Sequence, residues 1–213
     1  MIRAIAFDLD GTLVDSVTDL AAAANVAREA LGLAPLPAER VKSFVGDGVA
    51  VLVKRAITDD PTGEPSAESL EQALASFHAH YGEHLADHTR PYPGVIDGLQ
   101  QFQAQGLPLA IVTNKPEHHT HKLLQHLGLA GFFQVVMGGD SLPTRKPAPE
   151  PLLAVAERLA VEPAELLMVG DSENDVLCAR AAGCPVVVMR YGYAGAGVLP
   201  ADREADRLAD VLA

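Results

Sequence analysis

Hydrophobic residues recur along this chain with two different periods, and the change of period divides the sequence. Between residue 16 and about residue 87, apolar side chains return every three or four positions, which is the spacing of helices with one buried face. The clearest run is Leu70, Leu74, Phe77 and Tyr81. We therefore expect residues 16–87 to form an all-helical unit, whose first helix begins with a capping box at Ser16 and Asp19.

The rest of the chain alternates short apolar runs with helical patterns. The runs expected to be strands are 2–7, 109–113, 133–137, 166–169 and 185–189, and helices are expected around 123–127, 152–159 and 175–182. Strands that alternate with helices indicate a parallel sheet covered on both faces. The predicted fold is α/β, with a Rossmann-like parallel sheet core formed by residues 1–15 and 88–213 and an all-α insert at residues 16–87.

Composition narrows the class of ligand. The chain has 213 residues, of which 48% are hydrophobic, and a formal net charge of -12. This acidity argues against a nucleic-acid surface, because phosphate backbones recruit Lys and Arg. No basic amphipathic face or long apolar segment indicates a membrane partner. A small phosphorylated substrate remains compatible with the charge, since a bound divalent cation can invert the local field.

The two cysteines bear on the compartment. Cys178 and Cys184 lie in an expected helix and the turn after it, without the spacing of a disulfide framework. We expect both to be reduced core residues of a cytoplasmic protein. The sequence leaves open whether this protein is a monomer or a small homo-oligomer.

Two carboxylates stand at the end of the first apolar run. Asp8 and Asp10 follow residues 2–7, and Gly11 then bends the chain. Residues two apart in a strand point to the same face, so the two acids begin on one side. Two close carboxylates are costly unless a cation or a shared proton offsets their repulsion. The pair is a candidate metal and nucleophile site, although an acidic loop that caps a helix has the same local pattern.

Polar side chains also follow the other predicted strands. The second strand ends at Thr113 and Asn114, the third leads through a loop to Lys146, and the fourth ends at Asp171, with Asp175 shortly after it. Ligands of open α/β sheets gather beyond the carboxyl ends of the strands. We therefore expect these side chains to converge with the two N-terminal carboxylates at one rim of the sheet.

This ordered set resembles the haloacid dehalogenase-like hydrolase superfamily. The matching motifs are, in chain order, Asp8-Leu9-Asp10-Gly11-Thr12, Thr113-Asn114, Lys146-Pro147 and Gly170-Asp171-Ser172-Glu173-Asn174-Asp175. The helical insert between the first two motifs is similar to the small helical cap of that family. The resemblance implies a Mg²⁺-dependent phosphomonoester hydrolase that acts on a small phosphorylated metabolite through an aspartyl-phosphate.

The carboxylates divide the expected chemistry among them. Asp8 would attack phosphorus as the nucleophile, and Asp10 would protonate the leaving oxygen and later activate water. The resemblance implies that the backbone carbonyl of Asp10 also reaches the metal, so that Asp8, Asp10 and Asp171 form the metal set. Such an all-oxygen site suits Mg²⁺. Asp175 is expected to orient Lys146 or a metal-bound water instead of binding the metal directly.

The phosphoryl group is expected to be held by three further groups. The Thr113 hydroxyl and the Asn114 backbone N–H would donate to phosphoryl oxygens at the start of a helix. Lys146 would offset negative charge on both Asp8 and the phosphoryl group. The expected catalytic set is thus Asp8, Asp10, Thr113 and Lys146, and the expected phosphate-binding set is Asp8, Thr113, Asn114 and Lys146.

A glycine-rich loop in the insert is the candidate for substrate selection. Gly46, Asp47 and Gly48 join two expected helices, and their glycines allow close approach to a small ligand. A routine helix C-cap followed by a turn fits the same residues. The segment 43–48 looks like the cap loop of bacterial phosphoglycolate phosphatases, and segments 92–95 and 191–193 are also similar to that subfamily. The resemblance implies 2-phosphoglycolate as the substrate.

Other reactions use the same scaffold. A phosphatase for a sugar phosphate or for pyrophosphate remains open, because fold and core motifs do not fix the leaving group. Phosphosugar mutases carry an arginine beside the glycine of the cap loop, where this chain has Asp47 and Gly48. Metal-free carbon–halogen hydrolysis would leave Asp10 without a role. A catalytically inactive binding module is disfavoured because every core catalytic position is present.

Overall fold

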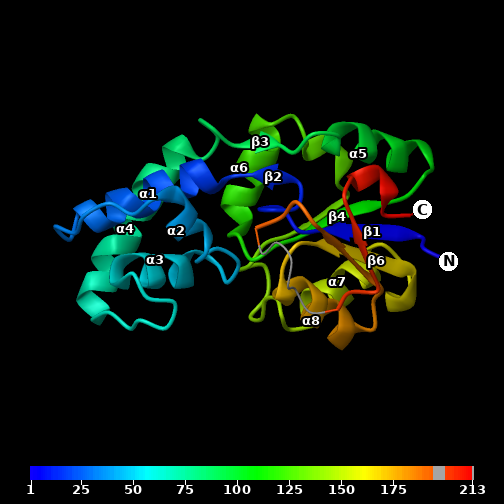
Figure 1. Ribbon diagram of the computed structural model, residues 1–213. Coiled ribbons are helices and arrows are strands. Elements are labelled where there is room, and N and C mark those ends of the chain that lie inside the picture. The colour runs from blue at the N-terminus through cyan, green and yellow to red at the C-terminus, as the bar shows by residue number, and fades with distance from the viewer. Residues whose placement is uncertain (194–199, 213) are drawn as a thin grey trace. The chain divides into compact units, whose positions relative to one another are not determined.

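The computed structural model describes residues 1–193 and 200–212; residues 194–199 and 213, which fall in the predicted core segment 88–213, lie outside the described residues. The chain divides into two compact units (Figure 1). The sheet unit consists of Met1–Asp15 with Pro91–Ala213, and the helical unit of Ser16–Arg90. The predicted fold class, an α/β sheet core with a helical insert, is confirmed.

The sheet unit is built on one parallel sheet, which has six strands among the described residues. Their order across the sheet is β5 (Val135–Met137), β4 (Leu109–Val112), β1 (Ala4–Phe7), β6 (Leu166–Gly170), β7 (Val186–Met189) and β8 (Arg203–Ala205). The predicted apolar runs correspond to the first five of these strands. Phe7 lies opposite Ile111 of β4 and Val169 of β6. The strand that carries the N-terminal acids therefore ends between its two neighbours at the same edge.

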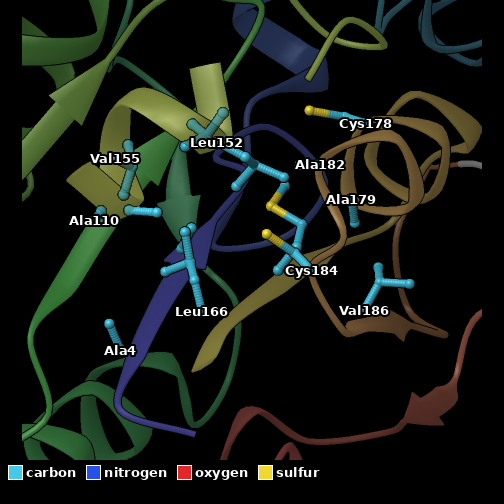
Figure 2. Close-up of a cluster of buried hydrophobic side chains, with 14 of the residues drawn as sticks. Ala4, Ala110, Leu152, Val155, Leu166, Cys178, Ala179, Ala182, Cys184 and Val186 are labelled. Atoms are coloured by element: carbon cyan, nitrogen blue, oxygen red, sulfur yellow. The ribbon is translucent and has the colours of Figure 1, made fainter. Parts of the chain in front are cut away.

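Alternating side chains of the strands bury both faces of this sheet. On one face, Figure 2 shows part of a cluster in which small strand residues such as Ala4 and Ala110 pack beneath α7 (Glu150–Arg158) and α8 (Glu173–Ala182). Both cysteines belong to this cluster and are free, as predicted. On the other face, Phe7 stacks on Phe102 of α5 (Val95–Ala104) with ring centroids 6.1 Å apart. Closely packed side chains therefore cover both faces of the sheet and hold its strand ends in place.

The remaining elements of the sheet unit are short. Two of them, β2 (Val14–Asp15) and β3 (Arg90–Pro91), pair with each other, and β3 begins at the last residue of the helical unit. The others are α6 (Glu117–His126) and the 3₁₀ turns η1 (Ala130–Phe132), η2 (Pro163–Glu165) and η3 (Leu208–Asp210). The elements that were not predicted include the helix α5 and the sixth strand of the main sheet, β8. Gly98, in the middle of α5, packs closely on Leu208 of η3. A Cβ at Gly98 would lie 3.1 Å from the Leu208 side chain.

The helical unit contains α1 (Val17–Glu29), α2 (Ala38–Lys42), α3 (Val49–Thr58) and α4 (Ala67–His84). α1 packs against the other three helices. Phe77 and Tyr81 are fully buried on α4, as their helical spacing predicted, and their rings stack with centroids 5.4 Å apart. No helix in the described part of the chain has the length and hydropathy that crossing a membrane requires.

The predicted capping box at the start of α1 is wrong. The Ser16 side chain makes no capping hydrogen bond to the helix that it precedes. The Asp19 carboxylate, which is buried, instead accepts hydrogen bonds from the backbone N–H groups of His88 and Thr89 and from the Thr89 hydroxyl, at 2.6 to 3.1 Å. A buried carboxylate requires several donors, and the returning segment supplies more of them than Ser16 could. Asp19 therefore ties the first turn of α1 to the end of the helical unit.

Candidate active site

The loop after β1 separates the two N-terminal acids. The Asp8 N–H still donates to the Val169 carbonyl of β6, at 2.9 Å, but the chain then turns tightly around the Leu9 carbonyl, which accepts from the N–H groups of Leu13 and Val14. Gly11 has a φ of 87°, a conformation that favours glycine. Because of this turn, the Asp8 and Asp10 carboxylates meet different partners.

Asp8 is paired with a buried lysine. The Lys146 ammonium, whose side chain is 2% exposed, lies 3.0 Å from Asp8 Oδ1 and 2.6 Å from Asp175 Oδ1. Burial alone would lower the pKa of Lys146, but the charges of Asp175 and Asp8 raise it above its usual value. Lys146 is therefore a fixed cation between two carboxylates.

Asp175 is held by donors on both of its oxygens. Oδ1 accepts from Lys146, while Oδ2 accepts from the backbone N–H groups of Asp171 and Ser172 and from the Ser172 hydroxyl, at 2.7 to 3.0 Å. Asp175 and Ser172 form a reciprocal capping box at the start of α8. A Cβ at Gly170, the last residue of β6, would lie 2.2 Å from the Asp175 Cγ, so this close packing requires glycine. Asp175 thus acts as an anchor for Lys146 and for the β6–α8 turn.

Asp171 lies beside the loop that follows β1. Its Oδ1 accepts from the Thr12 hydroxyl at 2.8 Å, and its Oδ2 accepts from the Tyr193 backbone N–H at 2.7 Å. A Cβ at Gly11 would lie 2.4 Å from Asp171 Oδ2. The Tyr191 hydroxyl donates to the Thr12 carbonyl at 2.7 Å and fixes the same loop from the other side. The segment 191–193, noted in the sequence, therefore orients Asp171.

The carboxylates of this site are crowded. One oxygen from each of Asp8, Asp171 and Asp175 lies within 4.8 Å of the other two. Burial raises the pKa of Asp171 to about 8, and the charges of Asp175 and Asp8 contribute to the increase. Burial also raises the pKa of Asp8 to about 6, against the attraction of Lys146, with Asp175 adding to the increase. A single ammonium does not balance these acids, so the donor set suits an additional cation.

The ligand atoms that this site offers are carboxylate oxygens, and they determine which cation would fit. Carboxylate oxygens without thiol or imidazole ligands suit a hard divalent ion such as Mg²⁺. Asp8 and Asp171 are the members of the triad that lie beside the β1 loop. Asp175 is instead held by Lys146 on one oxygen and by three hydrogen-bond donors of the β6–α8 turn on the other. The residues present therefore fit a magnesium ion, with Asp175 in a supporting position.

The segment after β4 brings two predicted residues and one further cation to the same edge. Thr113 is buried directly after the strand, and its Oγ1 accepts from the Lys115 N–H at 3.3 Å. The Asn114 side-chain amide donates to the Lys146 carbonyl at 2.9 Å, which links this segment to the loop that carries Lys146. The Lys115 ammonium contacts both oxygens of Asp10, at 2.8 and 3.0 Å.

Three contributors to this site were missed in the sequence. Thr12 was noted only as part of its motif, Tyr193 only within the segment 191–193, and Lys115 was not singled out. Thr12 and Lys115 each lie a few residues after the end of a predicted strand, where polar side chains meet at one edge of the sheet. That position was the available signal for both.

The predicted substrate loop lies in the helical unit, between α2 and α3. Gly46 and Gly48 both have positive φ, at 129° and 89°, and Gly48 caps the N-terminus of α3. Asp47 Oδ2 lies 2.6 Å from the guanidinium of Arg55 on α3. The loop is therefore held to its own helix by an ion pair, and its role in substrate selection stays a prediction.

Comparisons with known proteins agree on one family. The family model described as haloacid dehalogenase-like hydrolase matches residues 5–189. A phosphoglycolate phosphatase of Chromobacterium violaceum is 52% identical over 210 residues, which cover 99% of this chain and 95% of that protein. A phosphoglycolate phosphatase of Escherichia coli strain K12 is 44% identical, with 90% of this chain and 82% of that protein covered.

Solved structures show the same similarity. The crystal structure of a predicted phosphoglycolate phosphatase from Haemophilus somnus superposes with a TM-score of 0.92 at 36% identity, covering 99% of this chain and 96% of that one. A putative phosphoglycolate phosphatase from Lactobacillus delbrueckii subsp. bulgaricus superposes with a TM-score of 0.89 at 29% identity, covering 97% and 95%. Similarity therefore extends over both units.

Proposed function

The chain belongs to the haloacid dehalogenase-like hydrolase family and, within it, to the phosphoglycolate phosphatase family, and we propose on this basis that it hydrolyses 2-phosphoglycolate to glycolate and phosphate. The observation that carries the proposal is the cluster in which Lys146 joins Asp8 to Asp175 while Asp171 lies within 4.8 Å of both carboxylates. The relatives that cover nearly the whole chain support the choice of substrate.

The reaction proceeds in two steps at Asp8. An oxygen of Asp8 forms a bond to phosphorus while the bond from phosphorus to the glycolate oxygen breaks, and Asp10 gives its proton to that oxygen. Asp10 then takes a proton from water, whose oxygen attacks the aspartyl-phosphate, releases phosphate and restores Asp8. The separate partners of Asp8 and Asp10, Lys146 and Lys115, support this division of roles.

Other residues hold the phosphoryl group during transfer. The Thr113 hydroxyl and the Asn114 backbone N–H donate to its oxygens, and Lys146 offsets the charge that builds up beside Asp8. Asp175 keeps Lys146 in place. Asp8, the backbone carbonyl of Asp10 and Asp171 would hold Mg²⁺, which when bound supplies positive charge that lets an anionic phosphate approach the carboxylates.

The two parts of the chain take different roles in this proposal. We assign the chemistry to a catalytic core of residues 1–15 and 88–213, and substrate selection to a cap of residues 16–87 through Gly46, Asp47 and Gly48. The proposed compartment is the cytoplasm, because the free and buried Cys178 and Cys184 suit reducing conditions.

A panel of phosphate esters tests the proposed function. The full chain is assayed for phosphate release with Mg²⁺ on 2-phosphoglycolate, sugar phosphates, nucleotides and pyrophosphate. We expect the highest kcat/KM for 2-phosphoglycolate, because kcat/KM compares transition-state binding of competing leaving groups. A higher value for any other ester would reassign the substrate, and a requirement for a bisphosphate activator with little phosphate release would indicate a mutase.

A further inference from the structure

Lys115 is a buried cation beside Asp10, and no contact with the substrate has yet been assigned to it. Its side chain is 3% exposed, and its ammonium contacts both oxygens of Asp10, at 2.8 and 3.0 Å. Lys115 and Lys146 are the two buried lysines of the described residues. Lys146 contacts Asp8 and Asp175, whereas Lys115 contacts the proposed proton donor.

Lys115 lies next to the residue that is proposed to protonate the leaving group. Asp10 must touch the ester oxygen in order to protonate it. The Lys115 ammonium lies one hydrogen bond beyond the Asp10 carboxylate. In 2-phosphoglycolate a single methylene separates the ester oxygen from a carboxylate. When Asp10 is in contact with the ester oxygen, the substrate carboxylate is therefore only a few bonds away from the group that the Lys115 ammonium contacts.

A negatively charged leaving group favours a cation beside the proposed proton donor. A leaving group with a carboxylate adds a negative group to a site that already holds the phosphoryl group and the clustered carboxylates of Asp8 and Asp171, and like charges at short range are unfavourable. An uncharged leaving group creates no such repulsion. An ammonium carries three N–H donors and can contact more than one carboxylate.

We propose that Lys115 is a specificity-determining residue that recognises a carboxylate on the leaving group next to the ester oxygen. The inference rests on the proposed function and adds to the cap loop a residue of the core that recognises this class of leaving group. The alternative is that Lys115 only holds Asp10 in its productive orientation. A positioning role would affect all substrates alike, whereas recognition affects only those with the carboxylate.

A pair of matched substrates separates these roles. 2-Hydroxyethyl phosphate replaces the carboxylate of 2-phosphoglycolate with an uncharged hydroxymethyl group. The ratio of kcat/KM for the two esters is measured with Mg²⁺ for the wild type, Lys115→Gln and Lys115→Arg. Lys122→Gln, which removes an exposed lysine charge from α6, is the matched control. Because both esters are measured on one preparation, the ratio does not depend on the fraction of the variant that is folded.

Recognition by Lys115 predicts a specific result. In Lys115→Gln the ratio falls roughly 10- to 100-fold, the effect of losing a hydrogen bond between charged groups, and the fall appears mainly as a higher KM for 2-phosphoglycolate. Lys115→Arg keeps the positive charge, so the ratio should fall less than in Lys115→Gln. It should still fall somewhat, because the planar guanidinium does not fully replace an ammonium. Lys122→Gln leaves the ratio unchanged.

Two other results would overturn the inference in different ways. An equal fall in kcat for both esters, with an unchanged ratio, would make Lys115 a positioning residue for Asp10 and leave the proposed function intact. A wild-type ratio near one in an enzyme that hydrolyses both esters would remove the carboxylate preference itself, and with it both the inference and the proposed substrate.

Discussion

Buried aspartates in the two units differ in the charged groups that surround them. In the helical unit, the Asp19 carboxylate accepts hydrogen bonds from neutral donors of His88 and Thr89. In the sheet unit, Asp171 lies among other carboxylates, and its pKa is raised to about 8 by burial, then by Asp175 and Asp8. Burial is common to both, so burial by itself does not distinguish a structural acid from a functional one.

The difference lies in how the charge is balanced. Hydrogen bonds from fixed neutral groups let Asp19 link two ends of one unit, which is a structural role. At the end of the sheet, the acids outnumber the cations that contact them, and such an arrangement is stable only when another cation or a proton is present. Substitutions of the clustered acids in the sheet unit should therefore affect activity, metal binding and pH dependence, and a substitution of Asp19 should affect stability alone.

The largest effect is expected for Asp8→Asn. An amide cannot attack phosphorus as a carboxylate does, so kcat should fall by at least about 10⁴-fold. The melting temperature without metal should stay unchanged or rise, because one of the crowded carboxylates is removed. Phosphate release from 2-phosphoglycolate and thermal unfolding monitored by circular dichroism measure the two quantities. Substantial turnover by a preparation free of deamidated protein would exclude Asp8 as the nucleophile.

Removal of divalent metal should have the next largest effect. Without a cation the acids repel an anionic substrate, so thorough chelation should reduce activity by at least about 10³-fold. Mg²⁺ should also raise the melting temperature, since a ligand at a hundred times its Kd stabilises the folded state by about 2.7 kcal/mol.

Asp171→Asn is the matched variant for the metal experiment. It removes one proposed ligand and should abolish most of the increase in melting temperature that Mg²⁺ causes in the wild type. An equal increase in both proteins would place the ion elsewhere, and activity that persists after chelation would contradict the metal assignment.

The pattern of the sequence indicated the sheet and the site because both follow strong local signals. Buried parallel strands are continuous apolar runs, and the polar residues directly after them must lie at one edge of the sheet. Asp8 and Asp171 could therefore be placed together without any tertiary information. α5 was missed because Gly98 weakens its helical pattern, and only the contact with Leu208 explains a glycine there. β8 was missed because Arg203 and Glu204 are exposed on an edge strand.

Side-chain partners beyond the strand ends could not be predicted in the same way. The turn around Leu9 directs Asp8 toward Lys146 and Asp10 toward Lys115, and both lysines come from segments that are distant in the sequence. The capping box expected for Asp19 failed for a related reason. Local spacing proposed Ser16 as its partner, but a segment about seventy residues away provides better donors.

The pH dependence of stability should distinguish Asp171 within the site. The Asp171 carboxyl binds a proton more tightly in the folded protein than in the unfolded chain. Between pH 3.8 and about 8, the folded state therefore holds more protons than the unfolded state. Stability of the metal-free protein should therefore fall through that window, by about 1.4 kcal/mol per pH unit for one such group. Urea unfolding of the wild type and of Asp171→Asn at several pH values from 6 to 8 measures the slope. Equal slopes for the two proteins would contradict the raised pKa.

The smallest effect, and the one that separates the two units most clearly, is expected for Asp19→Asn. The amide has one acceptor oxygen, and its NH₂ group faces the N–H donors of His88 and Thr89, so the free energy of unfolding should fall by about 1–3 kcal/mol. Below the melting temperature, kcat for 2-phosphoglycolate should stay within about twofold of the wild type, because a structural acid acts only through the folded fraction. Urea unfolding and steady-state kinetics on the same preparation give both values. A large loss of kcat in fully folded Asp19→Asn would show that neutral surroundings do not mark a structural acid in this protein.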